Sequence, residues 1–314
     1  MKTLAICLAL LSAVALAVGT QLQNGAVGRE AKSSETDTSH LTLKQLVKLI
    51  KQPHWISGAA ISVLALALQF TALLLAPLIL VQPIGAIALV ITSILNAKIT
   101  KTRLNKASIT AICLCTFGLG AFVILAHDVA HEPDIDDNSL ILILLMVGAC
   151  IAIFGSVLLR GATKFKALTF IVGAGVLYGF VATLTKVVLK RLFNQDGFQR
   201  LISFNFEPTT DTLTLAATLC LIAAAFLGGW FLQNAYTSGP PDLAIAGLTV
   251  IDPLVAVSIG IVVLREAMNA PLPVVLGFVA SGAAAVIGVY LLSKVHPELL
   301  KPVQSKMETS PSKA

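Results

Sequence analysis

Long apolar runs alternate with short polar segments along most of the chain. A membrane-spanning helix needs about 20 predominantly apolar residues, and by that measure the pattern predicts nine spans. They are residues 3–24, 54–75, 77–97, 107–127, 139–159, 167–190, 212–236, 242–264 and 272–293. Residues 25–52 and 295–314 are polar, and the second segment, rich in Ser, Pro and Lys, is typical of a disordered tail. The pattern predicts an all-α polytopic membrane protein in which residues 1–314 form a single transmembrane domain.

Composition agrees with this class. The chain is 56% hydrophobic and 12% charged, and its mean hydropathy is +0.89, whereas soluble domains carry about 25% charged residues. The net charge of +6 does not indicate nucleic acid, because basic residues of membrane proteins collect in cytoplasmic loops. All five cysteines lie inside apolar runs without a CxxC pair, so neither a disulfide framework nor a metal site is expected.

The distribution of Lys and Arg predicts the orientation of the chain. Alternate polar segments on one side carry 16 of these residues, the other side carries 5, and Lys186 lies within a span. The positive-inside rule makes the richer side cytoplasmic. That side comprises residues 25–53, 98–106, 160–166, 237–241 and the C-terminal tail. The N-terminus is then outside and the C-terminus cytoplasmic, in the plasma (inner) membrane.

The first span resembles a secretory signal peptide, because Lys2 precedes an apolar stretch. Cleavage would leave the basic segment 25–52 outside, against the charge bias. We therefore expect residues 3–24 to be retained, with 25–52 as a cytoplasmic loop and 295–314 as a cytoplasmic tail.

Two spans contain an X–Pro step at corresponding places. Asp252–Pro253 lies in residues 237–266 and Gln82–Pro83 lies in residues 75–97. A proline inside a helix frees a backbone carbonyl and bends the helix, so each step predicts a break. Glu266 and Asn96 follow thirteen residues after the respective prolines.

The similarity extends to neighbouring spans and predicts an internal repeat. Each of the two spans is followed by a short polar turn and a Gly-rich span, and the matching spans lie five apart. An odd separation places the copies in opposite orientations. The pattern predicts two inverted repeats, residues 1–127 and 139–293, an architecture of many secondary transporters whose substrate path lies at the repeat interface.

These motifs resemble the drug/metabolite transporter (DMT) superfamily, its EamA-like group and an actinobacterial-type nine-helix permease in particular. Pro253 and Glu266 match the helix proline and the glutamate of that family's Gly–Glu ending, although Arg265 replaces the glycine. The first copy keeps Pro83 but has Asn96 in place of the glutamate. The resemblance implies a transporter with two inverted repeats. A related magnesium-transporter-like (NIPA) branch, which also has about nine helices, is the alternative.

Asp252 is the main candidate for a functional residue. An acid near the middle of a span costs about 2.5–3.5 kcal/mol to insert, so Asp252 is expected to bind a cation, a proton or a polar substrate group. The alternative is a local hydrogen bond, for example with Thr249. Gln82 occupies the corresponding place and either lines the path or satisfies the break at Pro83.

Other polar residues within the spans complete the predicted substrate or ion path. Lys186 lies near the outer end of its span, and extension of its side chain to the membrane surface is expected over pairing with Asp252. The predicted path comprises Asp252, Gln82, Pro253, Pro83, Lys186, Gln69, Tyr178, Gln233 and Asn234. The last four of these residues are alternatively interhelical hydrogen-bonding groups.

Two charged regions are predicted to lie outside the path. Arg265 and Glu266 are expected to form a weak surface pair at the outer end of their span. The acidic loop 127–137 also contains His127 and His131. It either gathers divalent cations or is simply solvated, and because its spacing matches no ligand set, no metal site is predicted.

The sequence contains no motif for catalysis or for ATP hydrolysis. It has no HExxH and no P-loop, so no enzyme activity and no cofactor are predicted. We expect a secondary-active transporter that moves a small metabolite, a drug-like compound or a lipid-linked precursor. The alternatives are Mg²⁺ transport and a non-transporting accessory protein of cell-envelope assembly. The expected partners are the substrate or ion and the lipid bilayer, and the oligomeric state is left open, with a homodimer as one alternative.

Overall fold

The computed structural model describes residues 1–33, 52–99, 106–132, 135–160, 167–193, 208–238 and 241–295. All regular structure in these ranges is helical, which confirms the predicted all-α class. The helices are α1 (Lys2–Ser33), α3 (Pro53–Leu75), α4 (Leu78–Gly85), α5 (Ile87–Ile99), α6 (Lys106–Val129), α7 (Asp137–Arg160), α8 (Ala167–Phe193), α10 (Pro208–Ser238), α11 (Pro241–Val262) and α12 (Leu272–Val295). The predicted tail, apart from residue 295, most of the loop 25–52 and the residues Pro133 and Asp134 lie outside the described residues.

Eight spans within the described residues are long and apolar enough to cross a bilayer, and all eight fall on predicted spans. The remaining predicted span, residues 242–264, corresponds to α11, whose apolar part is the shorter segment Gly247–Val262. Apolar runs become helices because hydrocarbon offers no partner to backbone groups, so each segment must satisfy them internally. The protein is therefore a polytopic membrane protein.

Two local expectations were wrong. The segment 25–52 does not begin as a loop, because α1 continues as a helix to Ser33. The two X–Pro steps also differ: the chain turns at Ala86 just after Pro83, which separates α4 from α5, whereas α11 continues through Pro253 without interruption. A missing N–H at a proline does not by itself end a helix when the neighbouring hydrogen bonds persist.

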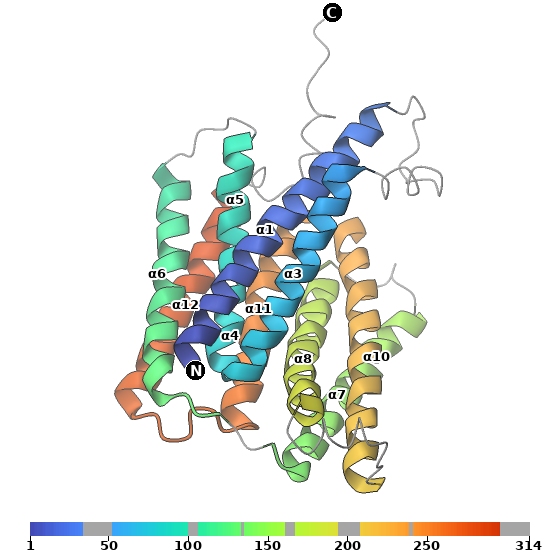
Figure 1. The fold of residues 1–314 in the computed structure, drawn as a ribbon, viewed down its shortest axis with the longest axis vertical. Coiled ribbons are helices and arrows are strands. Elements are labelled where there is room, and N and C mark those ends of the chain that lie inside the picture. The colour runs from blue at the N-terminus through green and yellow to red at the C-terminus, as the bar shows by residue number, and fades with distance from the viewer. Residues whose placement is uncertain are drawn as a thin grey trace, which may run out of the picture.

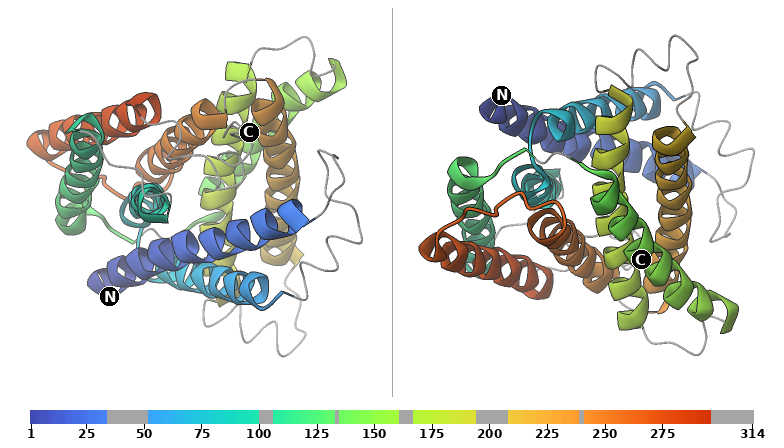
Figure 2. Two further views of the ribbon diagram at one scale, coloured as in Figure 1. Left: turned by 90° about the horizontal axis from the view of Figure 1, so that it is seen from above. Right: turned by 90° about the horizontal axis from the view of Figure 1, so that it is seen from below.

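The helices pack in pairs around a central column (Figures 1 and 2). α1 packs along α3, α6 along α12, and α8 lies against both α10 and α11. α4 and α5 stand in the middle of the bundle, where α4 contacts α1, α6 and α11. The N-terminus lies at the same end of the bundle as the connection between α11 and α12; we call this the N-terminal end. The division into two inverted repeats stays a prediction.

Small residues set the closest helix contacts. A Cβ added to Gly175 or Gly179 would lie 2.6 Å from Ile251 or Val255 respectively, so these glycines let α8 approach α11. On the other side of the bundle, a Cβ on Gly118 would lie 2.6 Å from the backbone nitrogen of Ala285, which joins α6 to α12. Such close contacts hold helices together where no hydrophobic driving force acts between them.

Candidate functional site

A cavity of about 480 Å³ lies between α1, α3, the α4–α5 junction and α11. We call it the central cavity. Its polar wall consists of Ser12, Ser62, Gln69, Gln82, Thr249 and Asp252, and most of its other lining residues are Ala and Leu. Asp252 is the one ionisable side chain among these described lining residues. The cavity thus gathers polar groups from helices that are far apart in the sequence.

One oxygen of the Asp252 carboxylate has no hydrogen-bond partner among the described residues. Within the described residues its Oδ1 atom is buried and accepts no hydrogen bond. The predicted local hydrogen bond is therefore absent at this oxygen. Because a buried acceptor without a hydrogen-bond partner costs about 1–3 kcal/mol, an unsatisfied carboxylate oxygen on a residue that lines a cavity is typical of a ligand-binding group.

The two X–Pro steps meet in space. Gln82 and Asp252 both line the central cavity, and Pro83 and Pro253 both line a second, smaller cavity of about 80 Å³. The corresponding residues of the two X–Pro steps thus line the same two cavities. The role of these residues in a substrate path stays a prediction.

Not every residue of the predicted path reaches the central cavity. Gln69 lines it, but Tyr178, Gln233, Asn234 and Lys186 are not among its lining residues. Gln233 is exposed on α10, and the Asn234 side chain donates to the Trp230 carbonyl oxygen at 2.8 Å. Tyr178 packs between α8 and α10, near Gly228 and Gly229.

A buried cluster of charged residues lies at the N-terminal end of the bundle. It consists of Glu132 after α6, Lys186 and Lys190 on α8, and Glu266 after α11, and we call it the charged cluster. The Lys186 ammonium lies 3.0 Å from Glu132 Oε1 and 3.9 Å from Glu266 Oε1, and it donates to the Ala76 carbonyl oxygen at 2.5 Å. The side chains of Lys186 and Glu266 are 0% exposed.

The prediction for Lys186 was therefore wrong. Its side chain does not extend to the surface, and its partners are Glu132 and Glu266 rather than Asp252. Lys190, one turn further along α8, pairs with Glu132 at 2.8 Å and is 23% exposed. Two basic residues of α8 thus neutralise an acid of the loop after α6.

The prediction for Glu266 was also wrong. Instead of a surface pair with Arg265, its two carboxylate oxygens accept the N–H groups of Leu78 and Ile79 at 2.8 Å each. A helix leaves its first four N–H groups without intrahelical partners. The next two, from Leu80 and Val81, are donated to the Pro77 carbonyl oxygen. Glu266 therefore completes the cap of α4, where a negative charge also interacts favourably with the helix dipole.

Local backbone geometry delivers Glu266 to this position. α11 ends at Val262, and Arg265 adopts a positive φ of 56° that turns the chain back. The Glu266 N–H then donates to the Gly260 carbonyl oxygen at 2.9 Å. A side chain at Gly260 would collide with Glu266, since an added Cβ would lie 2.7 Å from its Oε2 atom. One sequence signal pointed here, because Glu266 matches the glutamate of the DMT family ending.

The described part of the acidic loop has no cluster of metal-binding side chains. No group of three or more His, Cys, Asp or Glu side chains with metal-binding spacing occurs among the described residues. Its acids instead pair with α8: Glu132 with both lysines of the charged cluster, and Asp137 with Arg191. His127 contacts Asp128 at 2.9 Å.

Eight bilayer-length spans within the described residues, together with a cavity lined by residues of several helices and by one acid, are the architecture of a membrane transport protein. The family described as magnesium transporter NIPA matches residues 1–163, just over half of the chain. The chain belongs to this family, which is one of transporters rather than enzymes. It is the branch kept above as the alternative, and the EamA-like resemblance stays a prediction.

Two relatives extend the comparison. An uncharacterised protein of Corynebacterium glutamicum is 30% identical over 266 residues, which cover 84% of this chain and 85% of that protein. A protein of Arabidopsis thaliana named probable magnesium transporter NIPA1 is 31% identical over 87 residues, 28% of this chain and 25% of that protein. No solved structure matches the chain.

Proposed function

We propose that this protein is a secondary transporter that carries Mg²⁺ across the plasma membrane and binds the ion at Asp252. The observation that carries the proposal is the buried Oδ1 atom of Asp252, which has no hydrogen-bond partner within the described residues and lies at the central cavity. The family match and the name of the Arabidopsis thaliana relative support the choice of ion.

The chemistry of the cavity suits a hydrated divalent cation. Mg²⁺ releases its water reluctantly and is usually held through one or two carboxylates together with several retained waters. Six waters occupy about 180 Å³ at the liquid share of about 30 Å³ each, which fits within the cavity of about 480 Å³. Gln69 and Gln82 supply amide oxygens that accept hydrogen bonds from such waters.

A small organic substrate is the second candidate. Most of the lining residues are apolar, chiefly Ala and Leu, and pockets of about 300–1,000 Å³ with apolar walls and few polar groups are typical of organic ligands. Asp252 would then bind an amine or hydroxyl group of a small metabolite.

Transport without a P-loop requires an ion or substrate gradient as its source of energy. Alternating access would come from rocking of the two predicted repeats around the central cavity. In this scheme the N-terminal end faces the outside and the C-terminus lies in the cytoplasm, as the charge distribution predicts.

The test is flux into liposomes that contain the purified protein and a Mg²⁺-sensitive dye. Wild-type protein is expected to admit Mg²⁺ down its gradient, and Asp252→Asn, which keeps the size of the side chain but removes its charge, is expected to abolish the flux. Asp128→Asn is the matched control, because Asp128 is an exposed acid in the last turn of α6 that contacts His127 and does not line the cavity.

Each outcome selects one alternative. Flux that is equal in wild type and Asp252→Asn contradicts the proposed role of Asp252. Absence of Mg²⁺ flux together with Asp252-dependent counterflow of a metabolite supports the organic substrate. Absence of any flux from well-folded protein favours the non-transporting accessory protein.

A further inference from the structure

The charged cluster joins separate parts of the chain at one point. Lys186 of α8 contacts the Ala76 carbonyl oxygen at the end of α3, Glu132 after α6 and Glu266 after α11. Glu266 in turn holds the first turn of α4. The backbone adds a further link, because the His131 N–H donates to the Glu266 carbonyl oxygen at 2.7 Å. Separation of these segments at the N-terminal end must therefore break the cluster.

The cluster lies between the central cavity and the N-terminal end. On α3, Gln69 lines the cavity and Ala76 contacts Lys186, so about seven residues at 1.5 Å each separate the two levels by about 10 Å. On α4 the order is the same, with Leu78 at the cluster and Gln82 at the cavity.

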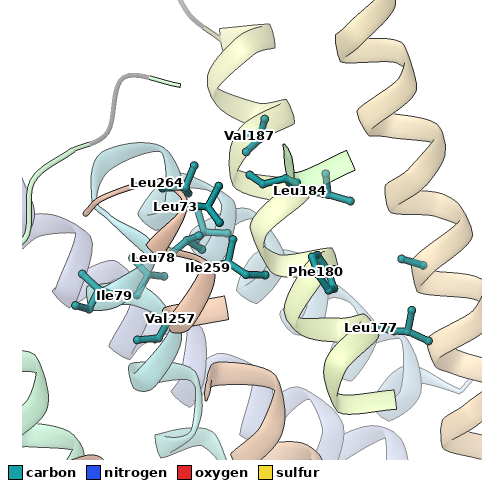
Figure 3. Packing of buried hydrophobic residues seen from close by; sticks show 14 of the residues in the cluster. Leu73, Leu78, Ile79, Leu177, Phe180, Leu184, Val187, Val257, Ile259 and Leu264 are labelled. Carbon is teal, nitrogen blue, oxygen red and sulfur yellow. The ribbon is translucent and has the colours of Figure 1, made fainter. Parts of the chain in front are cut away.

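An apolar layer fills the space beside the cluster. Figure 3 shows Leu73, Leu78, Leu184, Ile259 and Leu264 converging from α3, α4, α8 and the end of α11, and all five are buried. This layer gives the closed arrangement its packing, and the cluster gives it directional charged contacts.

Exposure within the cluster falls from the surface inward. Glu132 is 37% exposed, whereas Lys186 and Glu266 are 0% exposed. Water that reaches Glu132 is therefore next to Lys186, and charged groups that part can be hydrated where apolar groups cannot. Such a contact has a closed state held by ion pairs and an open state held by water.

We propose that Lys186, Glu132 and Glu266 form a gate that closes the central cavity toward the N-terminal end of the bundle. The proposal rests on the proposed transport function for its purpose, but its test needs no substrate.

The experiment measures access to the cavity from one side. In a background whose native cysteines are replaced by Ser, Gln82→Cys reports on the cavity, and a membrane-impermeant maleimide is applied to intact cells and to inverted vesicles. Asn138→Cys, at the exposed start of α7, marks the preparation in which the N-terminal end faces the reagent.

Lys186→Met is expected to make Gln82→Cys react about tenfold faster from the N-terminal side, which corresponds to about 1.4 kcal/mol of lost closure. Arg191→Met is the matched control, because it removes a basic side chain of the same helix whose partner is Asp137 rather than a residue of the gate. Its labelling rate is expected to equal that of the parent.

Two further measurements separate gating from loss of structure. With Cys115 restored in place of Gln82→Cys, labelling reports on unfolding, because Cys115 is 0% exposed between α6 and α12. A higher labelling rate at both positions, or an unchanged labelling rate at Gln82→Cys, contradicts the proposed gate. If Lys186→Met fails to reach the membrane, the charge-balanced double variant Lys186→Met/Glu266→Gln is measured by the same criteria. Increased access in Lys186→Met together with no flux by the wild-type protein would retain the gate and refute the transport function.

Discussion

Removal of the Glu266 carboxylate is expected to destabilise the protein strongly, because this group caps a helix within the bundle. In Glu266→Ala the N–H groups of Leu78 and Ile79 lose their acceptors, and the Lys186 ammonium loses one of its two carboxylates. A buried donor left without a partner costs about 1–3 kcal/mol. Two such donors give about 2–6 kcal/mol, and about 3 kcal/mol within this range is taken as the expected loss.

Thermal unfolding in detergent measures the effect. About 3 kcal/mol corresponds to a fall in Tm of about 6 °C, since large domains shift by about 2 °C for each kcal/mol. Glu266→Gln keeps one acceptor oxygen and is expected to lie between wild type and Glu266→Ala. Lys190→Met, which perturbs only the partly exposed edge of the charged cluster, is expected to shift Tm by less than about 1 °C.

A double-mutant cycle with Lys186→Met then isolates the ion pair. Removal of one partner leaves a buried charge uncompensated, so the double variant Lys186→Met/Glu266→Gln is expected to be more stable than the sum of the single changes predicts. A Glu266→Ala protein with an unchanged Tm would refute the assignment of Glu266 as the cap of α4.

Three further predictions follow from local geometry. Gly179→Ala is expected to lower the Tm and slow transport, because its Cβ would lie 2.6 Å from Val255 and the overpacking would cost about 1–3 kcal/mol. Gly148→Ala is the neutral control for the same assays, because an added Cβ there has no atom within 4 Å. Arg265→Gly is expected to leave the Tm unchanged or to raise it, because φ is 56° there and a glycine relieves up to about 1 kcal/mol of strain. A marked fall would show that the arginine side chain has a role of its own. Hydrogen bonds from the Ser139 side chain and then from the Ser139 N–H hold the pKa of Asp136 below its ordinary 3.8. This cap of α7 is therefore complete above pH 3.8 and is lost as the pH falls through the lowered value. Amide exchange at the start of α7 is expected to accelerate only in that acidic range, and Asp136→Asn is expected to remove the pH dependence.

The sequence predicted the spans well because hydrocarbon leaves the backbone few alternatives. All eight bilayer-length spans fall on predicted runs, and α3 begins at Pro53, one residue from its predicted start. The sequence also paired Gln82 with Asp252, because each precedes the proline of a repeated X–Pro step, and both residues line the central cavity. Boundaries were less accurate where polar residues continue a helix, as in the extension of α1 to Ser33.

The charged cluster could not be predicted from sequence neighbours. Arg265 is adjacent to Glu266 and suggested an ion pair, but the N–H of Leu78 that binds Glu266 lies 188 residues away. A local signal did exist: Pro77 starts a helix inside an apolar run, so its first N–H groups require an acceptor from elsewhere in the protein.

The sequence alone determined that this chain spans a membrane many times and carries an acid near the middle of one span, because length and hydropathy decide both. Only the tertiary structure decided which charges are partners and which one faces a cavity. The reason is that burial and pairing depend on groups brought together from distant segments. Thus Lys186 and Glu266 are satisfied by one another and by the backbone, whereas Asp252 retains a buried oxygen at the central cavity with no partner within the described residues.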